Sequence, residues 1–176
     1  LDAGVVAPVP IAVPLTRILE DTAAALQDEA DRRGMVIQVA GRTCHAWADR
    51  TMLERVIQNL AANAVRHGAG RVLLASRLRG DRCLVQVWDQ GPGIPEADRA
   101  RIFDEFVQLG NRERDRRQGL GLGLAMVHRI CELNGWRLKL ESRVDHGTVF
   151  SVELPTAQVQ PNASPMDRAP GGRAVS

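Results

Sequence analysis

The most restrictive feature of this sequence is a helical pattern between Asp49 and His67 whose two faces differ in chemistry. Apolar residues recur at spacings of three and four, as in an amphipathic helix that packs on a core: Leu53, Val56, Ile57, Leu60, Ala61 and Ala64. One side of this helix therefore needs an apolar layer against it. Since 176 residues with 44% hydrophobic composition can bury a substantial core, we expect one compact domain.

The other face of the same helix carries an unusual row of polar side chains. Asn59, Asn63, Arg66 and His67 follow one another at spacings of three and four residues. Asn is a poor helix former, and solvated faces favour Lys, Glu, Arg or Gln, so two stacked amides need a reason. An amide oxygen is a hard neutral ligand for Mg²⁺, and an arginine one turn later suits phosphate. The row indicates a site for a nucleotide with its metal; the alternative is that both amides satisfy nearby backbone groups.

A carboxylate at the end of a predicted strand is the second candidate for a binding role. Residues 71–79 and 82–89 are predicted to form a hairpin, and strand alternation places Asp89 on its apolar, helix-facing side. A buried polar group without partners costs roughly 2 to 7 kcal/mol. Gly91 and Gly93 follow directly and allow a ligand to approach the backbone. We interpret Asp89 as an acceptor for an exocyclic amine; the alternative is a carboxylate that caps the loop.

A second glycine-rich segment, Gly119-Leu120-Gly121-Leu122-Gly123-Leu124, opens another predicted helix. Glycines ahead of a helix N-terminus expose amide donors to an anion, and the helix dipole adds favourable potential. The preceding residues 109–118 are charge-dense and contain four arginines, so we interpret them as a lid over phosphates, with a solvated loop as the alternative. Because no predicted strand precedes the glycines, the dinucleotide-binding βαβ fingerprint does not apply.

The remaining pattern predicts a small α/β domain between two irregular ends. Predicted elements are an edge strand at 11–13, a helix at 14–33, a strand at 35–40, a turn at 41–45, a short helix at 97–106 and a closing hairpin at 136–142 and 148–154. Thr148 ends an apolar ladder of that hairpin, where it assists a ligand or bonds the backbone. We expect residues 1–12 to be a linker, 13–155 the folded domain and 156–176 a disordered tail.

Composition argues against several other classes of protein. A net charge of +2, with three Trp, three Phe and no Tyr, offers neither the charge nor the stacking surface for nucleic acid. The three cysteines, Cys44, Cys83 and Cys131, lack metal-ligand spacing, and we expect them to be reduced. No stretch is patterned as a signal peptide or a membrane span, so we expect a cytoplasmic domain, with membrane attachment of the full-length protein left open.

Four motifs in this order resemble the ATP-binding catalytic domain of sensor histidine kinases, within the GHKL ATPase superfamily. They are an N box at 59–64, a first glycine box at 89–94, an F box at 102–106 and a second glycine box at 119–124. The resemblance covers about residues 11–155. It implies an α/β (α+β) fold, a two-layer sandwich in which a mixed, mostly antiparallel sheet packs on three helices. It also implies an enzyme, a protein-histidine kinase that uses ATP and Mg²⁺.

The resemblance assigns roles to individual residues. It implies that Asn63 coordinates Mg²⁺ with help from Asn59, that both form the catalytic set with Arg66, and that Asp89 recognises the adenine amine. Arg66 stands where Lys is common and His67 where an aromatic residue is common; Arg keeps the charge for phosphate. The implied nucleotide-binding set is Asn59, Asn63, Arg66, His67, Asp89, Gly91, Gly93, Ile94, Gly119, Leu120, Gly121, Leu122, Gly123, Leu124 and Thr148.

The same resemblance implies two protein partners. The phosphoacceptor histidine of such kinases lies on a dimerising helical hairpin, and a response regulator receiver domain then takes the phosphate. None of the four histidines here is followed by an acidic residue and Pro, so we expect the hairpin outside this chain and a homodimer at full length. Two alternatives remain: a degenerate kinase domain that acts as an adaptor, and a GHKL ATPase of the chaperone, topoisomerase or mismatch-repair kind, in which a general-base Glu precedes the N-box Asn.

Overall fold

The computed structural model describes residues 7–104 and 122–157. Along the chain the elements are β1 (Ile11–Pro14), α1 (Leu15–Arg32), β2 (Val36–Gly41), β3 (His45–Ala48), α2 (Arg50–His67), β4 (Arg71–Arg79), β5 (Arg82–Asp89), the 3₁₀ turns η1 (Glu96–Asp98) and η2 (Arg101–Phe103), α3 (Gly123–Asn134), β6 (Arg137–Arg143) and β7 (Gly147–Pro155). The predicted lid, Gly119, Leu120, Gly121 and the end of the F box lie outside the described residues.

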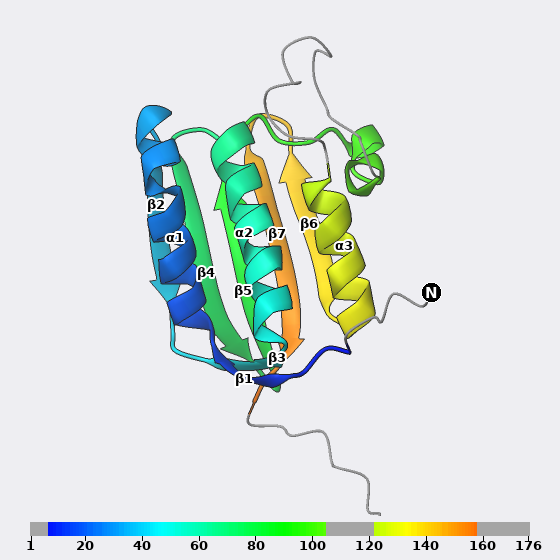
Figure 1. Ribbon diagram of the computed structural model, residues 1–176. Coiled ribbons are helices and arrows are strands. Elements are labelled where there is room, and N and C mark those ends of the chain that lie inside the picture. Colours follow the sequence, from blue (N-terminus) through cyan, green and yellow to red (C-terminus); the bar gives the residue numbers. More distant parts are fainter. Residues whose placement is uncertain (1–6, 105–121, 158–176) are drawn as a thin grey trace, which may run out of the picture.

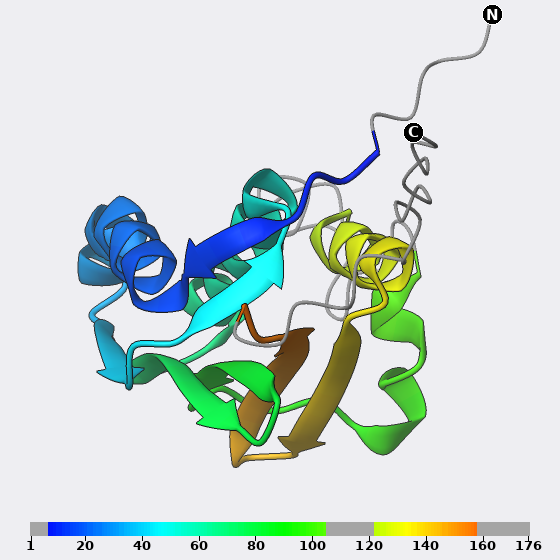
Figure 2. The ribbon, with the colours of Figure 1, turned by 90° about the horizontal axis from the view of Figure 1, so that it is seen from below.

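In the described residues, a five-stranded sheet carries α1, α2 and α3 on one face (Figures 1 and 2). Strand order is β2-β4-β5-β7-β6; β2 pairs with β4 in parallel and the other neighbours are antiparallel. A separate two-stranded ribbon, β1 with β3, lies where the chain enters α2. The predicted two-layer sandwich with a mixed, mostly antiparallel sheet is confirmed.

The apolar face of α2 forms the middle of the core. All six residues predicted to pack there are buried, and Val65 joins them. Opposite them lie the helix-facing side chains of β5 and β7, among them Val85, Val87 and Phe150, each 1% exposed. Burial of one such aliphatic or aromatic side chain contributes roughly 1.5–3 kcal/mol, so this helix is fixed on the sheet by its sequence pattern.

The start of α2 is fixed by a side-chain cap. The Asp49 carboxylate accepts hydrogen bonds from the backbone N–H of Met52 at 3.0 Å and of Val9 at 3.1 Å. These backbone donors, that of Met52 first, lower the pKa of Asp49. One residue therefore caps the helix and holds the segment that precedes β1.

Three expectations differ from the structure in detail. The short helix predicted at 97–106 is two 3₁₀ turns in its described part, because only Ile102 is buried and Asp104 is already extended. His45 begins β3 rather than ending a turn. The ordered backbone also runs past residue 155: Thr156 pairs with Ala46, and the N–H of Ala157 donates to the carbonyl of His45 at 2.8 Å.

Candidate functional site

The two asparagines of α2 have different surroundings. Asn59 donates its amide Nδ2 to the carbonyl of Arg55 at 2.7 Å, one turn back in the helix. Its oxygen Oδ1 faces the start of α3, where a Cβ on Gly123 would lie only 2.9 Å away. The Asn63 amide makes no hydrogen bond within the described parts of the chain. The amide nitrogen of Asn59 thus satisfies a backbone carbonyl, as the alternative interpretation expected. The Asn59 oxygen and the whole Asn63 amide remain available to a ligand.

Arg66 and His67, the other two residues of the predicted polar row, lie in the last turn of α2. Arg66 Nε lies 3.8 Å from Glu29 Oε1 of α1, and the Arg66 carbonyl accepts from Arg33 Nη1 at 3.1 Å. His67 is exposed and forms the last residue of the helix. Sequence spacing placed Arg66 on the asparagine row, but it could not show that α1 brings a carboxylate to it. In this structure Arg66 contacts α1.

Asp89 lies at the end of β5, opposite Thr148 of β7, as strand alternation predicted. Its Oδ1 accepts from the N–H of Gly91 at 2.8 Å. Half-burial raises the pKa of the Asp89 carboxyl, and hydrogen bonds from the backbone of Gly91 and Thr148 act in the opposite direction. The ionised form of Asp89 is therefore less stable here than it is in water.

Three glycines surround Asp89, and none of them has room for a side chain. A Cβ on Gly91 would lie 2.8 Å from Asp89 Oδ1, and one on Gly68 would lie 2.9 Å from Asp89 Cβ. A Cβ on Gly147, whose φ is +88°, would lie 2.0 Å from the Asp89 carbonyl oxygen. Bare backbone therefore packs around Asp89, with Gly91 beside its carboxylate, Gly68 beside its Cβ and Gly147 beside its backbone carbonyl. This cradle joins the end of α2, the first glycine box and the β6–β7 turn.

A serine that the sequence did not single out connects these parts. Ser142 Oγ lies 2.9 Å from Thr148 Oγ1, accepts from the N–H of Ile94 at 2.8 Å and lies 3.0 Å from the carbonyl of Gly147. Arg99 adds a hydrogen bond from Nη2 to the Ser142 carbonyl at 2.5 Å. The predicted hairpin at 136–142 and 148–154 could have indicated this serine, because its register in the structure pairs Ser142 with Thr148. Thr148, the β7 partner of Asp89, is thus oriented by a second hydroxyl.

Gly93 and Ile94 contact the β6–β7 hairpin. Gly93 has a φ of +72°, and a Cβ there would lie 2.1 Å from the Arg143 carbonyl. The carbonyl of Pro92 accepts from the N–H of Asp145 at 2.8 Å. The close approach that Gly93 permits is therefore one of backbone to backbone, which fixes the loop after Asp89.

The N-terminus of α3 completes the described site. Leu122 is the N-cap and has no side-chain cap; Gly123 starts the helix, and Leu124 packs against the core. The first N–H groups of a helix have no partner within it, so this end offers donors toward Asn59. The structure places Gly123 beside Asn59, one turn before Asn63 on α2, and separately brings together Asp89, Gly91 and Thr148.

Other kinds of site find no support in the described residues. They contain no group of three or more His, Cys, Asp or Glu side chains able to hold a metal ion. The three cysteines are free and buried, and burial raises the pKa of Cys83 and of Cys131 to about 12. None of the described helices has the length and apolarity needed to cross a membrane.

Comparison with known proteins identifies the family of this chain. The sequence profile of the histidine kinase-, DNA gyrase B-, and HSP90-like ATPase family matches residues 48–158. The chain is 38% identical over 129 residues to the alginate biosynthesis sensor protein KinB of Pseudomonas aeruginosa, covering 72% of this chain and 21% of KinB. It is 36% identical over 169 residues to the circadian input-output histidine kinase CikA of Synechococcus elongatus, covering 90% of this chain and 22% of CikA.

A solved structure shows the same fold. The crystal structure of full-length ShkA in complex with AMPPNP superposes with a TM-score of 0.77 at 31% sequence identity, covering 88% of this chain and 33% of ShkA. The chain belongs to the histidine kinase-, DNA gyrase B-, and HSP90-like ATPase family. Within that family it is an ATP-binding catalytic domain of the sensor histidine kinase type, as the four motifs predicted. It spans about a fifth of the length of KinB and CikA.

Proposed function

We propose that this chain is the phosphoryl-donor domain of a protein-histidine kinase. It binds ATP with Mg²⁺ and donates the γ-phosphate to a histidine on a separate helical hairpin of the same protein, from which a response regulator receiver domain receives it. The observation that carries the proposal is the Asp89 carboxylate in its cradle of three glycines, beside a helix whose Asn63 amide has no partner in the described structure.

Adenine recognition is assigned to the cradle. The Asp89 carboxylate accepts from the exocyclic amine of the base, while Thr148, oriented by Ser142, stands on the neighbouring strand. Since Gly91 places only backbone beside the carboxylate, a flat ring can approach it closely. A base that presents a carbonyl at this position would face an acceptor with another acceptor, so the site favours ATP over GTP.

Phosphate and metal are assigned to the α2–α3 side of the site. Asn63 Oδ1, with Asn59 Oδ1 assisting, would hold Mg²⁺, and amide oxygens suit that hard cation. When bound, the metal ion neutralises charge that develops on the transferring phosphoryl group. The N–H groups at the start of α3, near Gly123, offer donors to phosphate oxygens. Gly119, Leu120 and Gly121 stay predicted phosphate contacts.

Arg66 must leave its ion pair with Glu29 before it can contact phosphate as predicted. Its ion pair with Glu29 is 3.8 Å long, and the two side chains are 41% and 27% exposed. Such partly exposed pairs contribute about 0–1 kcal/mol, so a nucleotide phosphate can compete for the guanidinium at small cost. The adjacent His67 is proposed to line the same side of the nucleotide.

The chemistry assigned to the chain is positioning. Phosphoryl transfer requires the acceptor nitrogen roughly in line with the γ-phosphate and charge stabilisation around it, more than it requires covalent help from the protein. We propose that a dimer of the full-length protein brings the hairpin to the open side of the site, and that the domain works in the cytoplasm.

Transfer of radiolabel from [γ-³²P]ATP tests this division of labour. The chain alone, incubated with Mg²⁺ and labelled ATP, should acquire no acid-labile, base-stable phosphate. Addition of the phosphoacceptor hairpin should restore labelling, on the hairpin alone, and Asn63→Ala should abolish it. Strong labelling of a histidine within this chain would contradict the proposal. Failure to bind ATP at all would favour a degenerate, adaptor-like domain instead.

A further inference from the structure

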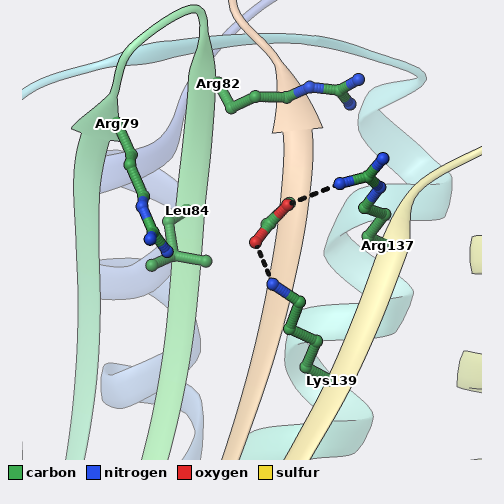
Figure 3. Close-up of a pocket in the computed structure, with 6 residues that line it drawn as sticks. Arg79, Arg82, Leu84, Arg137 and Lys139 are labelled. Atoms are coloured by element: carbon green, nitrogen blue, oxygen red, sulfur yellow. Dashed lines mark hydrogen bonds and ion pairs between the residues drawn. The ribbon is translucent and has the colours of Figure 1, made fainter.

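A concave region lies on the sheet face opposite the helices (Figure 3). It is a hollow of about 250 Å³ lined by Arg79, Arg82, Leu84, Arg137, Lys139 and Glu153. The strand register explains why these side chains meet: Arg79 pairs with Arg82, Leu84 with Glu153, and Glu153 with Arg137. Asp89 lies at the other end of β5 and on its other face. The hollow is therefore separate from the nucleotide site.

The hollow has an excess of positive charge. Four of its six lining residues are cationic and one is a carboxylate, a net formal charge of +3. Glu153 is shared by Lys139, at 2.7 Å, and Arg137, at 3.9 Å, whereas Arg79 acts on it only through longer-range charge. No carboxylate in the described ranges lies within 4.0 Å of the Arg79 or Arg82 guanidinium. Two guanidinium groups beside the hollow are thus outside any ion pair of that length, in a chain whose formal charge is only +2 overall.

The same sheet face also presents apolar surface. Trp88 follows Arg82, Leu84 and Gln86 in alternation along β5, and it is 43% exposed. Its neighbours across the ladders are Leu73 and Val149, both half-buried. Trp88 lies six positions after Arg82 along the strand, a span of about 20 Å. One continuous face therefore carries a cationic hollow at one end and an exposed aromatic side chain at the other.

We propose that this sheet face docks an acidic segment of a protein partner, with Asp or Glu side chains in the hollow and an apolar side chain against Trp88. Guanidinium groups match carboxylates with paired hydrogen bonds, which suits Arg79 and Arg82. A span of about 20 Å between the two parts exceeds the reach of a small anion and fits a polypeptide. The chain's own residues 158–176 carry one Asp and two Arg, so they lack the complementary charge.

Binding of a fluorescein-labelled hexaglutamate peptide, followed by fluorescence anisotropy, tests the charged part. We expect salt-sensitive binding that Arg79→Gln/Arg82→Gln weakens about tenfold, roughly threefold for each exposed charge pair. The matched control, Arg17→Gln/Arg129→Gln, removes two exposed arginines from α1 and α3 and should leave binding unchanged. Thermal unfolding and ATP affinity should match the parent in both variants, because neither pair belongs to the core or the nucleotide site.

A longer peptide tests the second part. Hexaglutamate joined to Leu-Leu by a flexible spacer of about eight Gly and Ser residues can span the face, so it should bind more tightly than hexaglutamate. Trp88→Ser should remove that gain and leave hexaglutamate binding unchanged. The proposal is overturned if acidic peptide does not bind, if Arg79→Gln/Arg82→Gln has no effect, or if the longer peptide shows no gain. Tighter binding of inorganic tripolyphosphate or of oligothymidine than of the peptides would also overturn it.

Discussion

Replacement of Asp89 by Asn separates the role of this residue in binding from its effect on folding. The side chain keeps its shape but loses its charge and gains a donor. In the parent, Oδ1 accepts from the Gly91 N–H at 2.8 Å, and the other carboxylate oxygen is proposed to accept from the adenine amine. An Asn that keeps the Gly91 bond turns its NH₂ toward the amine, whereas the flipped Asn turns NH₂ toward Gly91. Either way one donor faces another donor.

The mismatch sets the size of the effect. A donor left unsatisfied costs about 1–3 kcal/mol, so ATP affinity should fall by about 5- to 150-fold. GTP presents a carbonyl where ATP presents the amine, and the side-chain NH₂ introduced by Asp89→Asn can donate to that carbonyl. We therefore expect GTP affinity to fall less than ATP affinity, or to rise, and the preference for ATP to weaken.

Stability of the nucleotide-free protein should move in the opposite direction. Burial raises the folded-state pKa of Asp89 above its ordinary value, so the unfolded state releases this proton at lower pH than the folded state. The parent consequently loses stability as pH rises from the ordinary aspartate pKa through the raised one. Asp89→Asn has no such titration, and at neutral pH its Tm should equal or exceed that of the parent.

Two measurements cover both effects: calorimetric titration with ATP and GTP, and thermal unfolding followed from below the ordinary aspartate pKa up to neutral pH. Asp81→Asn, at the exposed β4–β5 turn, is the matched control and should change neither binding nor stability. Unchanged ATP affinity in Asp89→Asn would refute the adenine role. A large drop in Tm would show instead that the carboxylate supports the fold.

Three further changes test other parts of the account. Asn63→Ala removes the proposed ligand of Mg²⁺, so it should abolish Mg²⁺-dependent ATP binding in calorimetry. Because the Asn63 side chain makes no hydrogen bond among the described residues, Tm should change little. Gly147→Ala introduces a Cβ 2.0 Å from a backbone carbonyl and should cost more than about 2 kcal/mol in urea unfolding, whereas Gly80→Ala, with nothing within 4 Å, should cost about 1 kcal/mol; equal costs would contradict the cradle. The hydrogen bond from Lys139 is the main cause that lowers the pKa of Glu153, so the stability advantage of the parent over Glu153→Gln, complete at neutral pH, should shrink as pH falls below the ordinary glutamate pKa; a difference independent of pH would contradict it.

Local patterns predicted much of the fold and the parts of the site that strands and helices fix directly. The apolar period of α2 and the alternation of β5 placed Asn63 and Asp89 on the correct elements and faces, because side-chain direction follows from backbone geometry. The β6–β7 hairpin was also expected, with Thr148 on its buried face. The four motifs then identified the family.

Contacts between elements that are distant in the chain could not be predicted from the sequence. The pairing of Arg66 with Glu29 depends on how α1 lies beside α2, and no local spacing encodes that distance. The residues that line the hollow around Glu153 come from four strands. In the sequence, each of these cationic residues taken alone looks like an ordinary surface residue. The stretch 97–106 has an apolar spacing that suits a helix, yet its described part makes only 3₁₀ turns, since such a short segment gains too little from propensity alone.

A crystal structure of this domain with an ATP analogue and Mg²⁺ would show directly whether Asp89 binds adenine and Asn63 binds the metal ion. We expect the adenine amine at hydrogen-bond distance, about 2.7–3.2 Å, from the Asp89 carboxylate, and Mg²⁺ at about 2.0–2.1 Å from Asn63 Oδ1. A nucleotide whose base lies away from Asp89, or a metal ion held without Asn63, would contradict this expectation.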